Sequence, residues 1–598
     1  MPDKTFLRTV LSLVFCASGL SAAAQEFDPA GWDTNKNYPA IGSPEAKKGG
    51  TFRAYWPGFP PTLRTHGPGA NSAAAREVHG LMYESLVNLH PGTLEYMPGL
   101  ADYWKVSGDK RRFTFHINQK ARWADGTPVT ADDVVATWEF GARPDLRDPS
   151  SPMRWDDDFE KPVAESRDMV SVKTKKLHWR FFLYFGSMSI YPAKELSALA
   201  GERYLEEYDW KSQTGSGPYE LKAGDIKKEG SITLTRRADY WAENEWRNTG
   251  LNNFDKISWL AIPDEELAFG KFKEGGLDYY PVSKARKWLE ECDFEKIKKG
   301  WIQKRKIYTE APRGFSGFAF NLRKPPFADV DVRKAFAYLL NREKLIDKLF
   351  FHEYDFLDSY YPGGVWENPD NPEIRFNPLM AQRLLEKAGW KSRNKDGWLV
   401  KDGKIFELTF EYGDPDMTGI YKALQEDLEK AGIRLILKQT DPAALRKKVG
   451  ERNFTLHFQS WDALLFPDPA SYWTSELADT QSGNNITGFK NQEADALCGK
   501  YGAAFGREEQ KRIMRELDGI IFRSHPYALA WGSNFTRILY HDKFGHPKEY
   551  FSRTGDDKDM KTLWWIDPEK EKLLEGAAAG NRALSVGETI QKPWQKRL

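Results

Sequence analysis

Residues 317–346 read GFAFNLRKPPFADVDVRKAFAYLLNREKLI, and this stretch decides the fold class. Phe318 and Phe320 alternate with small or polar neighbours, which predicts a strand with one buried face. The prolines at 325–326 end that strand because proline has no N–H to donate to a ladder. Asp329 then stands at the N-cap of a helix, and Asn341 begins a second one. The first helix keeps its apolar residues on one face: Val332, Ala335, Phe336, Leu339 and Leu340.

A strand–helix–strand pattern follows at 405–438. Residues 406, 408 and 410 are apolar and alternate with polar ones, and apolar residues recur with the same spacing at 433, 435 and 437, which predicts two strands. The helix between them carries Ile420, Leu424 and Leu428 on one face and ends at Gly432. Parallel strands joined by a helix imply a right-handed crossover, so the expected fold class is α/β.

The N-terminus resembles a secretory signal peptide at 1–24. Lys4 and Arg8 precede an apolar run, and three alanines precede Gln25, where we expect cleavage. The alternative is a buried N-terminal helix. Cys16 raises a second alternative, lipid attachment, against which the bulky Phe15 before it argues.

Composition limits the function classes. The chain has 87 Lys and Arg against 86 Asp and Glu, and loss of the signal would leave 85 of each. A net charge near zero argues against a general nucleic-acid or anionic-membrane surface. Roughly 570 mature residues are too many for one core, so about three or four domain-sized units are expected.

The motifs of common catalytic sites are absent from the sequence. It has no P-loop, HExxH or GxSxG, and the glycines at 215–217 lack the third glycine and the helix of a nucleotide site. Cys292 and Cys498 are far apart; each is expected to be a buried thiol, although their pairing stays open. A pair of carboxylates for glycoside hydrolysis would be invisible in one sequence. We therefore expect no enzyme, no catalytic residue, no metal and no cofactor.

Several segments taken in order resemble family 5 of the extracellular solute-binding proteins, which deliver peptides and other solutes to ABC importers. These segments are 49–52, 113–138, 215–219, 318–346, 381–390, 424–433, 488–497 and 525–526. Each is weak alone, but their common order and spacing are specific. Two stretches, 349–361 and 562–567, resemble the Yej-type oligopeptide and microcin C binding proteins within that family.

The resemblance implies a two-lobed periplasmic binding protein, type II and cluster C-like, with an extra subdomain inserted in lobe one. Lobe one is expected at 25–76, 212–312 and 534–598, with a loosely held tail beyond about residue 570. The inserted subdomain is expected at 77–211 and lobe two at 313–533. The chain would cross between the lobes near Gly314 and Ser533, and solute would be captured as the lobes close.

The candidate site comes from two loops, 56–64 and 458–469, and from a strand near residue 531. The candidate ligand contacts are Trp56, Phe59, Arg64, Trp461, Asp462, Asp468 and Trp531. Each has a structural alternative: the first loop as a connector, Asp468 as a helix start, Trp531 as packing. Peptide-binding members of the family often place an Asp soon after the tryptophan that corresponds to Trp461. Leu464 stands there, so the resemblance does not supply the usual partner of the peptide amino group.

The leading hypothesis is a periplasmic, monomeric binding protein for peptide-like solutes, including modified or peptidoglycan-derived peptides. Its partners would be the permease and ATPase of an inner-membrane ABC importer. An oligosaccharide receptor is the second hypothesis, favoured if Trp56, Trp461 and Trp531 line one trough. The third is a secreted hydrolase.

Overall fold

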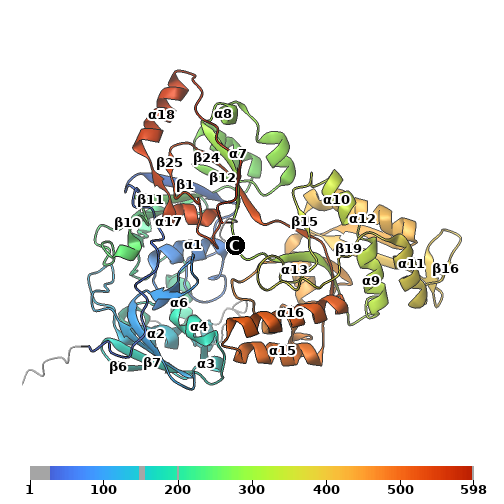
Figure 1. Ribbon diagram of the computed structural model, residues 1–598, viewed down its shortest axis with the longest axis horizontal. Coiled ribbons are helices and arrows are strands. Elements are labelled where there is room, and N and C mark those ends of the chain that lie inside the picture. The colour runs from blue at the N-terminus through green and yellow to red at the C-terminus, as the bar shows by residue number, and fades with distance from the viewer. Residues whose placement is uncertain (1–26, 147–154, 198–200, 595–598) are drawn as a thin grey trace, which may run out of the picture.

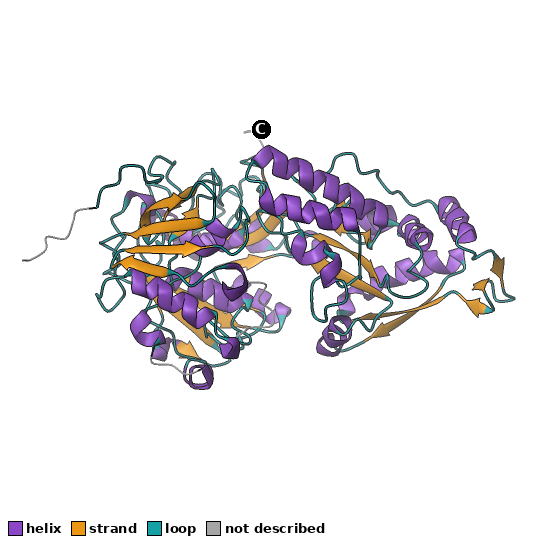
Figure 2. Cartoon of the chain, turned by 90° about the horizontal axis from the view of Figure 1, so that it is seen from below, coloured by secondary structure: helices purple, strands orange, loops and turns teal. Residues whose placement is uncertain are grey.

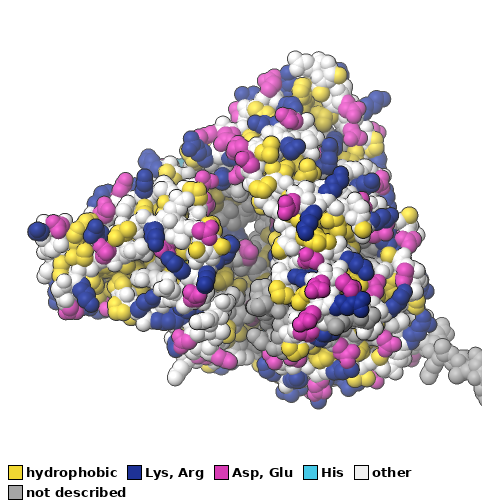
Figure 3. Space-filling model, turned by 180° about the vertical axis from the view of Figure 1, so that it is seen from behind, with side chains coloured by type: hydrophobic (Ala, Val, Ile, Leu, Met, Phe, Trp, Pro, Cys, Tyr) yellow, Lys and Arg dark blue, Asp and Glu magenta, His cyan; other side chains and the backbone are white. Residues whose placement is uncertain are grey.

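The computed structural model describes residues 27–146, 155–197 and 201–594. The predicted signal peptide and Cys16 lie outside these residues. Two halves lie side by side and are joined by extended segments near the middle of the molecule (Figures 1 and 2). Seen from behind, a hollow separates them (Figure 3).

The half on the left of Figure 1 is built on a five-stranded sheet in the order β1-β11-β10-β8, with β9 paired to β10. Its strands are β1 (Thr51–Trp56), β8 (Tyr219–Glu220), β9 (Ile226–Lys227), β10 (Ser231–Arg236) and β11 (Lys256–Ala261). Helix α1 (Ala73–Met82) packs into the same core through Val78 and Leu81. The predicted border after residue 76 therefore falls inside a helix that belongs to this half.

A second sheet, in the order β4-β5-β7-β6, lies within the segment predicted as the inserted subdomain. The elements of this segment are β2 (Val87–Leu89), β3 (Tyr96–Pro98), β4 (Ala101–Val106), β5 (Arg112–Ile117), α2 (Ala131–Gly141), α3 (Trp155–Asp158), β6 (Val163–Ser166), β7 (Met169–Lys173), α4 (Phe181–Gly186), α5 (Ala193–Leu196) and α6 (Gly201–Glu207). Thr130 is the N-cap of α2, and the carboxylate of Asp133 in its first turn accepts from the Thr130 N–H at 2.7 Å.

A four-stranded sheet, β12-β24-β13-β27, brings the C-terminal segment back beside residues 279–308. Its strands are β12 (Tyr279–Pro281), β13 (Ile302–Tyr308), β24 (Phe535–His541) and β27 (Ile590–Gln591), and helices α7 (Glu265–Glu274) and α8 (Glu295–Lys298) adjoin it. The expectation of a loose tail beyond residue 570 is wrong. Pro568–Ala579 forms helix α18, capped by the Asp567 side chain, and β27 pairs with β13.

The half on the right of Figure 1 is built on the sheet β20-β19-β21-β14-β22. Its strands are β14 (Phe315–Phe320), β19 (Glu407–Tyr412), β20 (Arg434–Gln439), β21 (Leu456–Trp461) and β22 (Tyr527–Leu529). Strand β14 is buried on both faces rather than one, because separate apolar clusters cover the two sides of the sheet: Phe318 and Phe320 face one, Phe315 and Ala319 the other.

The helices of this half are α9 (Val330–Leu339), α10 (Arg342–Lys348), α11 (Pro378–Lys387), α12 (Thr418–Ala431), α13 (Pro442–Gly450), α14 (Ala470–Trp473), α15 (Gln492–Ala503) and α16 (Arg507–Ser524). Asp329 and Asn341 cap α9 and α10 as predicted, each accepting a backbone N–H. The strand–helix–strand prediction is also confirmed, since β19 and β20 are parallel and Gly432 ends α12 in a left-handed conformation.

No strand of residues 313–533 pairs with a strand elsewhere in the described part of the chain. The chain passes from β13 to β14 and returns from β23 (Trp531–Gly532) to β24, which places two crossings near Gly314 and Ser533. The remaining strands form small sheets: β15 (Asp355–Phe356) with β23, β16 (Ser392–Arg393) with β17 (Leu399–Lys401) and β18 (Lys404–Ile405), and β25 (Phe544–Gly545) with β26 (Trp565–Ile566).

Candidate functional site

Three of the predicted residues, Trp461, Asp462 and Asp468, line one pocket beside the first crossing between the halves. Six more of its lining residues are aromatic: Phe315, Tyr360, Tyr361, Trp366, Tyr472 and Trp473. The pocket encloses about 60 Å³. That is room for roughly four or five water molecules, which is the size of a side chain rather than of a whole solute.

Strand pairing positions Trp461 in this aromatic pocket. It is the last residue of β21 and pairs with Phe315 at the start of β14. The indole Nε1–H donates to the Tyr527 hydroxyl at 3.0 Å, and the ring packs edge-on against Tyr472 with centroids 5.1 Å apart. Gly314 allows the close approach of the two segments, because a Cβ there would lie 1.6 Å from the Trp461 carbonyl oxygen.

Three charged groups line the aromatic pocket: the carboxylates of Asp462 and Asp468 and the guanidinium of Arg313. The Asp462 side chain is exposed and has no hydrogen bond or ion pair among the described residues. Arg313 is half-buried, 4.0 Å from Asp355, and burial lowers the pKa of its guanidinium. A free carboxylate and a weakly paired guanidinium beside aromatic faces suit a solute that carries both charges.

The sequence reasoning missed the residue that fixes part of this pocket. Asp518 of α16 is fully buried and accepts from the Ser359 hydroxyl at 2.7 Å and from the Tyr360 N–H at 2.9 Å. It also accepts from the Asn368 N–H and the Asn371 amide. These bonds hold the segment that carries Tyr360, Tyr361 and Trp366. The sequence offers one sign of this role: Asp518 stands on the apolar face of its helix. The segment that it holds lies about 150 residues earlier in the chain, so no local pattern connects the two.

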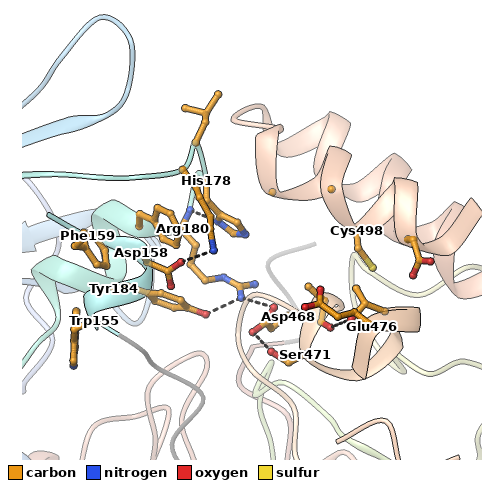
Figure 4. A pocket seen from close by; sticks show the side chains of 18 residues that line it. Trp155, Asp158, Phe159, His178, Arg180, Tyr184, Asp468, Ser471, Glu476 and Cys498 are labelled. Carbon is orange, nitrogen blue, oxygen red and sulfur yellow. Dashed lines mark hydrogen bonds and ion pairs between the residues drawn. The ribbon is translucent and has the colours of Figure 1, made fainter. Parts of the chain in front are cut away.

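A larger cavity of about 680 Å³ lies on the other side of Asp468, between the 155–184 segment and residues 468–502 (Figure 4). Its volume is in the range of ligand sites. One wall is aromatic and comes from Trp155, Phe159, Phe181 and Tyr184. The opposite wall comes from α14, the turn after it, and α15.

Arg180 joins the two walls, and Figure 4 shows it reaching from the start of α4 toward Asp468. Its Nη1 lies 3.3 Å from the Asp468 carboxylate and donates to the Tyr184 hydroxyl at 2.8 Å. Its Nη2 donates to the carbonyls of Phe466 and Pro467. The prediction that Asp468 lines a ligand site and the alternative of a helix start are therefore not exclusive, since Asp468 also accepts from the Ser471 hydroxyl in α14.

The structure places the other candidate residues away from these two pockets. Trp56 ends β1 instead of opening a loop, and its ring stacks on Trp259 at 4.9 Å in the core of the first half. Phe59 packs against Trp210. Arg64 donates to the carbonyls of Leu205 and Pro68.

Trp531 is buried in the second half, where it stacks on Phe458 with centroids 5.5 Å apart. Because Trp56 and Trp531 lie in separate cores, the three tryptophans Trp56, Trp461 and Trp531 do not line one trough. Cys292 and Cys498 are separate buried thiols, and burial raises the pKa of Cys292 to about 11 and of Cys498 to about 12. Within the described ranges, no group of three His, Cys, Asp or Glu is arranged to hold a metal.

Comparison with known proteins identifies the family. The profile of the bacterial extracellular solute-binding proteins, family 5 (middle), matches residues 95–484. The chain belongs to this family. It is 25% identical over 545 residues to the probable peptide-binding protein YejA of Agrobacterium fabrum, covering 84% of this chain and 87% of that protein. This similarity confirms the Yej-type resemblance.

Solved structures show that the fold is that of two-lobed α/β binding proteins. The oligopeptide-binding protein AppA of Bacillus subtilis, solved with a nonapeptide, superimposes with a TM-score of 0.70 at 21% identity and covers 88% of this chain and 100% of that one. An oligopeptide transporter component of Thermotoga maritima, solved with mannohexaose, gives 0.65 at 18% identity, with 86% and 97% covered. In the described parts of this family 5 protein, no helix is both long and apolar enough to cross a bilayer.

Proposed function

We propose that this family 5 protein binds peptide-like solutes between its two halves and presents them to the permease and ATPase of an ABC importer. The observation that carries the proposal is the aromatic pocket with the free carboxylate of Asp462 and the half-buried Arg313 in its lining. A peptide end offers the complementary pair of a charged amino group and backbone carbonyls, and its first side chain matches the size of the pocket.

The proposal assigns Asp462 the part that an Asp at the position of Leu464 plays in other family members. Leu464 lines the same pocket with an exposed apolar side chain, so it supplies no charge. Asp462 lies two residues earlier in the same loop. The protein acts as a monomer in the periplasm, captures solute without turning it over, and uses no metal, cofactor or nucleic acid.

Mass spectrometry of solutes released from protein purified from its native compartment tests the proposal. Peptides are expected. Glycans without peptides would favour the oligosaccharide receptor instead, and degradation of added peptides would favour a hydrolase.

Titration calorimetry with a peptide that has a free amino terminus tests the role of Asp462. Asp462→Asn should weaken binding about tenfold or more, because a hydrogen bond to a charged group contributes about 1.5–3 kcal/mol. The N-acetylated peptide should bind both proteins equally weakly. Asp402→Asn is the matched control, because Asp402 is an exposed turn residue outside the pocket. This variant should bind the peptide with unchanged affinity. Equal affinity of Asp462→Asn and the unaltered protein would remove Asp462 from the site.

A further inference from the structure

The 680 Å³ cavity beyond Asp468 has an excess of negative charge. Four carboxylates line it, from Asp158, Asp468, Glu476 and Asp495, against two cations, Lys176 and Arg180. Both cations are already paired, Lys176 with Asp158 at 3.4 Å and Arg180 with Asp468 at 3.3 Å. His178 adds no positive charge near neutral pH, because burial lowers its pKa to about 4.

Two carboxylates therefore remain without a cation in this cavity. Glu476 has no hydrogen bond or ion pair among the described residues. Asp495 accepts one backbone N–H, that of Ser475, at 2.8 Å. Facing them across the cavity is the aromatic wall, with Trp155 and Tyr184 (Figure 4). A cation between carboxylates and aromatic faces gains from both.

We propose that the cavity is a second subsite, which receives a positively charged side chain of a bound peptide. The inference rests on the proposed function and names its substrate class: the preferred solutes are basic peptides. The amino terminus lies at Asp462 in the aromatic pocket. The chain then passes Asp468, which lines both pockets, and a lysine- or arginine-like side chain lies between the aromatic wall and the Glu476 and Asp495 carboxylates.

Calorimetry on the full-length protein tests this with alanine pentapeptides that carry one lysine at positions two to five. Each is matched with a norleucine peptide, which keeps the chain length and removes the charge. At one position or more, lysine should bind about tenfold tighter than norleucine, and the preference should shrink as salt is raised. Lysine and norleucine binding equally at every position would overturn the inference alone. No binding by any peptide would overturn the proposed function as well.

Two variants assign the preference to the cavity. Glu476→Gln and Asp495→Asn should each reduce the lysine-to-norleucine ratio several-fold while norleucine affinity stays unchanged. Asp495→Asn keeps the carbonyl oxygen that accepts the Ser475 N–H, so the turn is preserved. Glu493→Gln is the control, because Glu493 is exposed in the first turn of α15 and does not line the cavity. A ratio that stays the same in both variants would overturn the assignment.

Discussion

At the scale of single residues, Asp518 has the strongest expected pH dependence. Burial raises its pKa to about 6, although four hydrogen bonds to the carboxylate act in the opposite direction. The pKa in the unfolded chain is about 3.9. Between these values the folded protein holds a proton that the unfolded chain has lost. The stabilising contribution is therefore full below pH 4 and declines as pH rises to 6.

Comparison with Asp518→Asn measures this contribution. The difference in unfolding free energy, unaltered protein minus variant, should fall by about 2 kcal/mol between pH 4 and pH 7, measured by denaturant titration. Asp370→Asn, at an exposed position in the segment that Asp518 holds, is the control. A flat profile for Asp518→Asn would show that this carboxyl titrates normally.

At the scale of elements, β14 depends on a glycine. A Cβ on Gly317 would lie 2.6 Å from the Ala528 carbonyl oxygen in the neighbouring strand β22, a clash with backbone that cannot rotate away. Gly317→Ala should lower the unfolding free energy by about 1–3 kcal/mol, as overpacking in cores does. Gly419→Ala is the matched control. Nothing lies within 4 Å of that Cβ in helix α12, so this change should stabilise by up to about 1 kcal/mol. Equal stability of the two variants would contradict the packing argument.

Local patterns predicted the elements well, and failed where distant segments meet. The caps Asp329 and Asn341 and the parallel pair β19–β20 follow from spacing within about 35 residues. The pairing of β27 with β13 joins residues almost 300 apart, and a two-residue strand has no periodicity to reveal it.

The candidate site shows the same difference between residues that are close in sequence and residues that are distant. Trp461, Asp462 and Asp468 lie within one short stretch at the end of β21 and in the loop after it, and the sequence predicted them together. Arg180, which completes the cavity, reaches Asp468 from a different half of the fold, and no sequence pattern links two residues so far apart.

At the scale of the whole molecule, three sets of ion pairs between described residues hold residues 313–533 against the rest. One is exposed: Lys284 pairs with Asp416 at 2.7 Å. The second is largely buried beside the crossings, where Glu353 pairs with Lys306 of β13 at 2.8 Å and with Arg537 of β24 at 3.0 Å. The third is buried too: beside the Arg180–Asp468 pair, the Trp179 backbone N–H donates to the Gly502 carbonyl at 2.9 Å.

Exposed pairs contribute about 1 kcal/mol or less, whereas removing one partner of a buried pair costs about 3–5 kcal/mol. Because the Glu353 pairs lie beside the strands that carry the chain between the halves, we expect them to persist in both forms. The Arg180 contact, away from the crossings, should therefore dominate the balance between closed and open forms.

Arg180→Ala should shift the ligand-free protein toward the open form, because it removes the ion pair and the bonds to the Phe466 and Pro467 carbonyls in one step. A shift of about 3 kcal/mol changes the ratio of forms by more than a hundredfold, which small-angle X-ray scattering records as a larger radius of gyration. Lys284→Ala, which breaks the exposed pair between the same halves, should leave the radius unchanged. In Arg180→Ala, part of the binding free energy of the solute is spent on closing the protein. The apparent affinity for solute should therefore fall in Arg180→Ala and not in Lys284→Ala. An unaltered radius of gyration in Arg180→Ala would contradict this prediction. It would mean that contacts other than the Arg180–Asp468 pair decide between the closed and open forms.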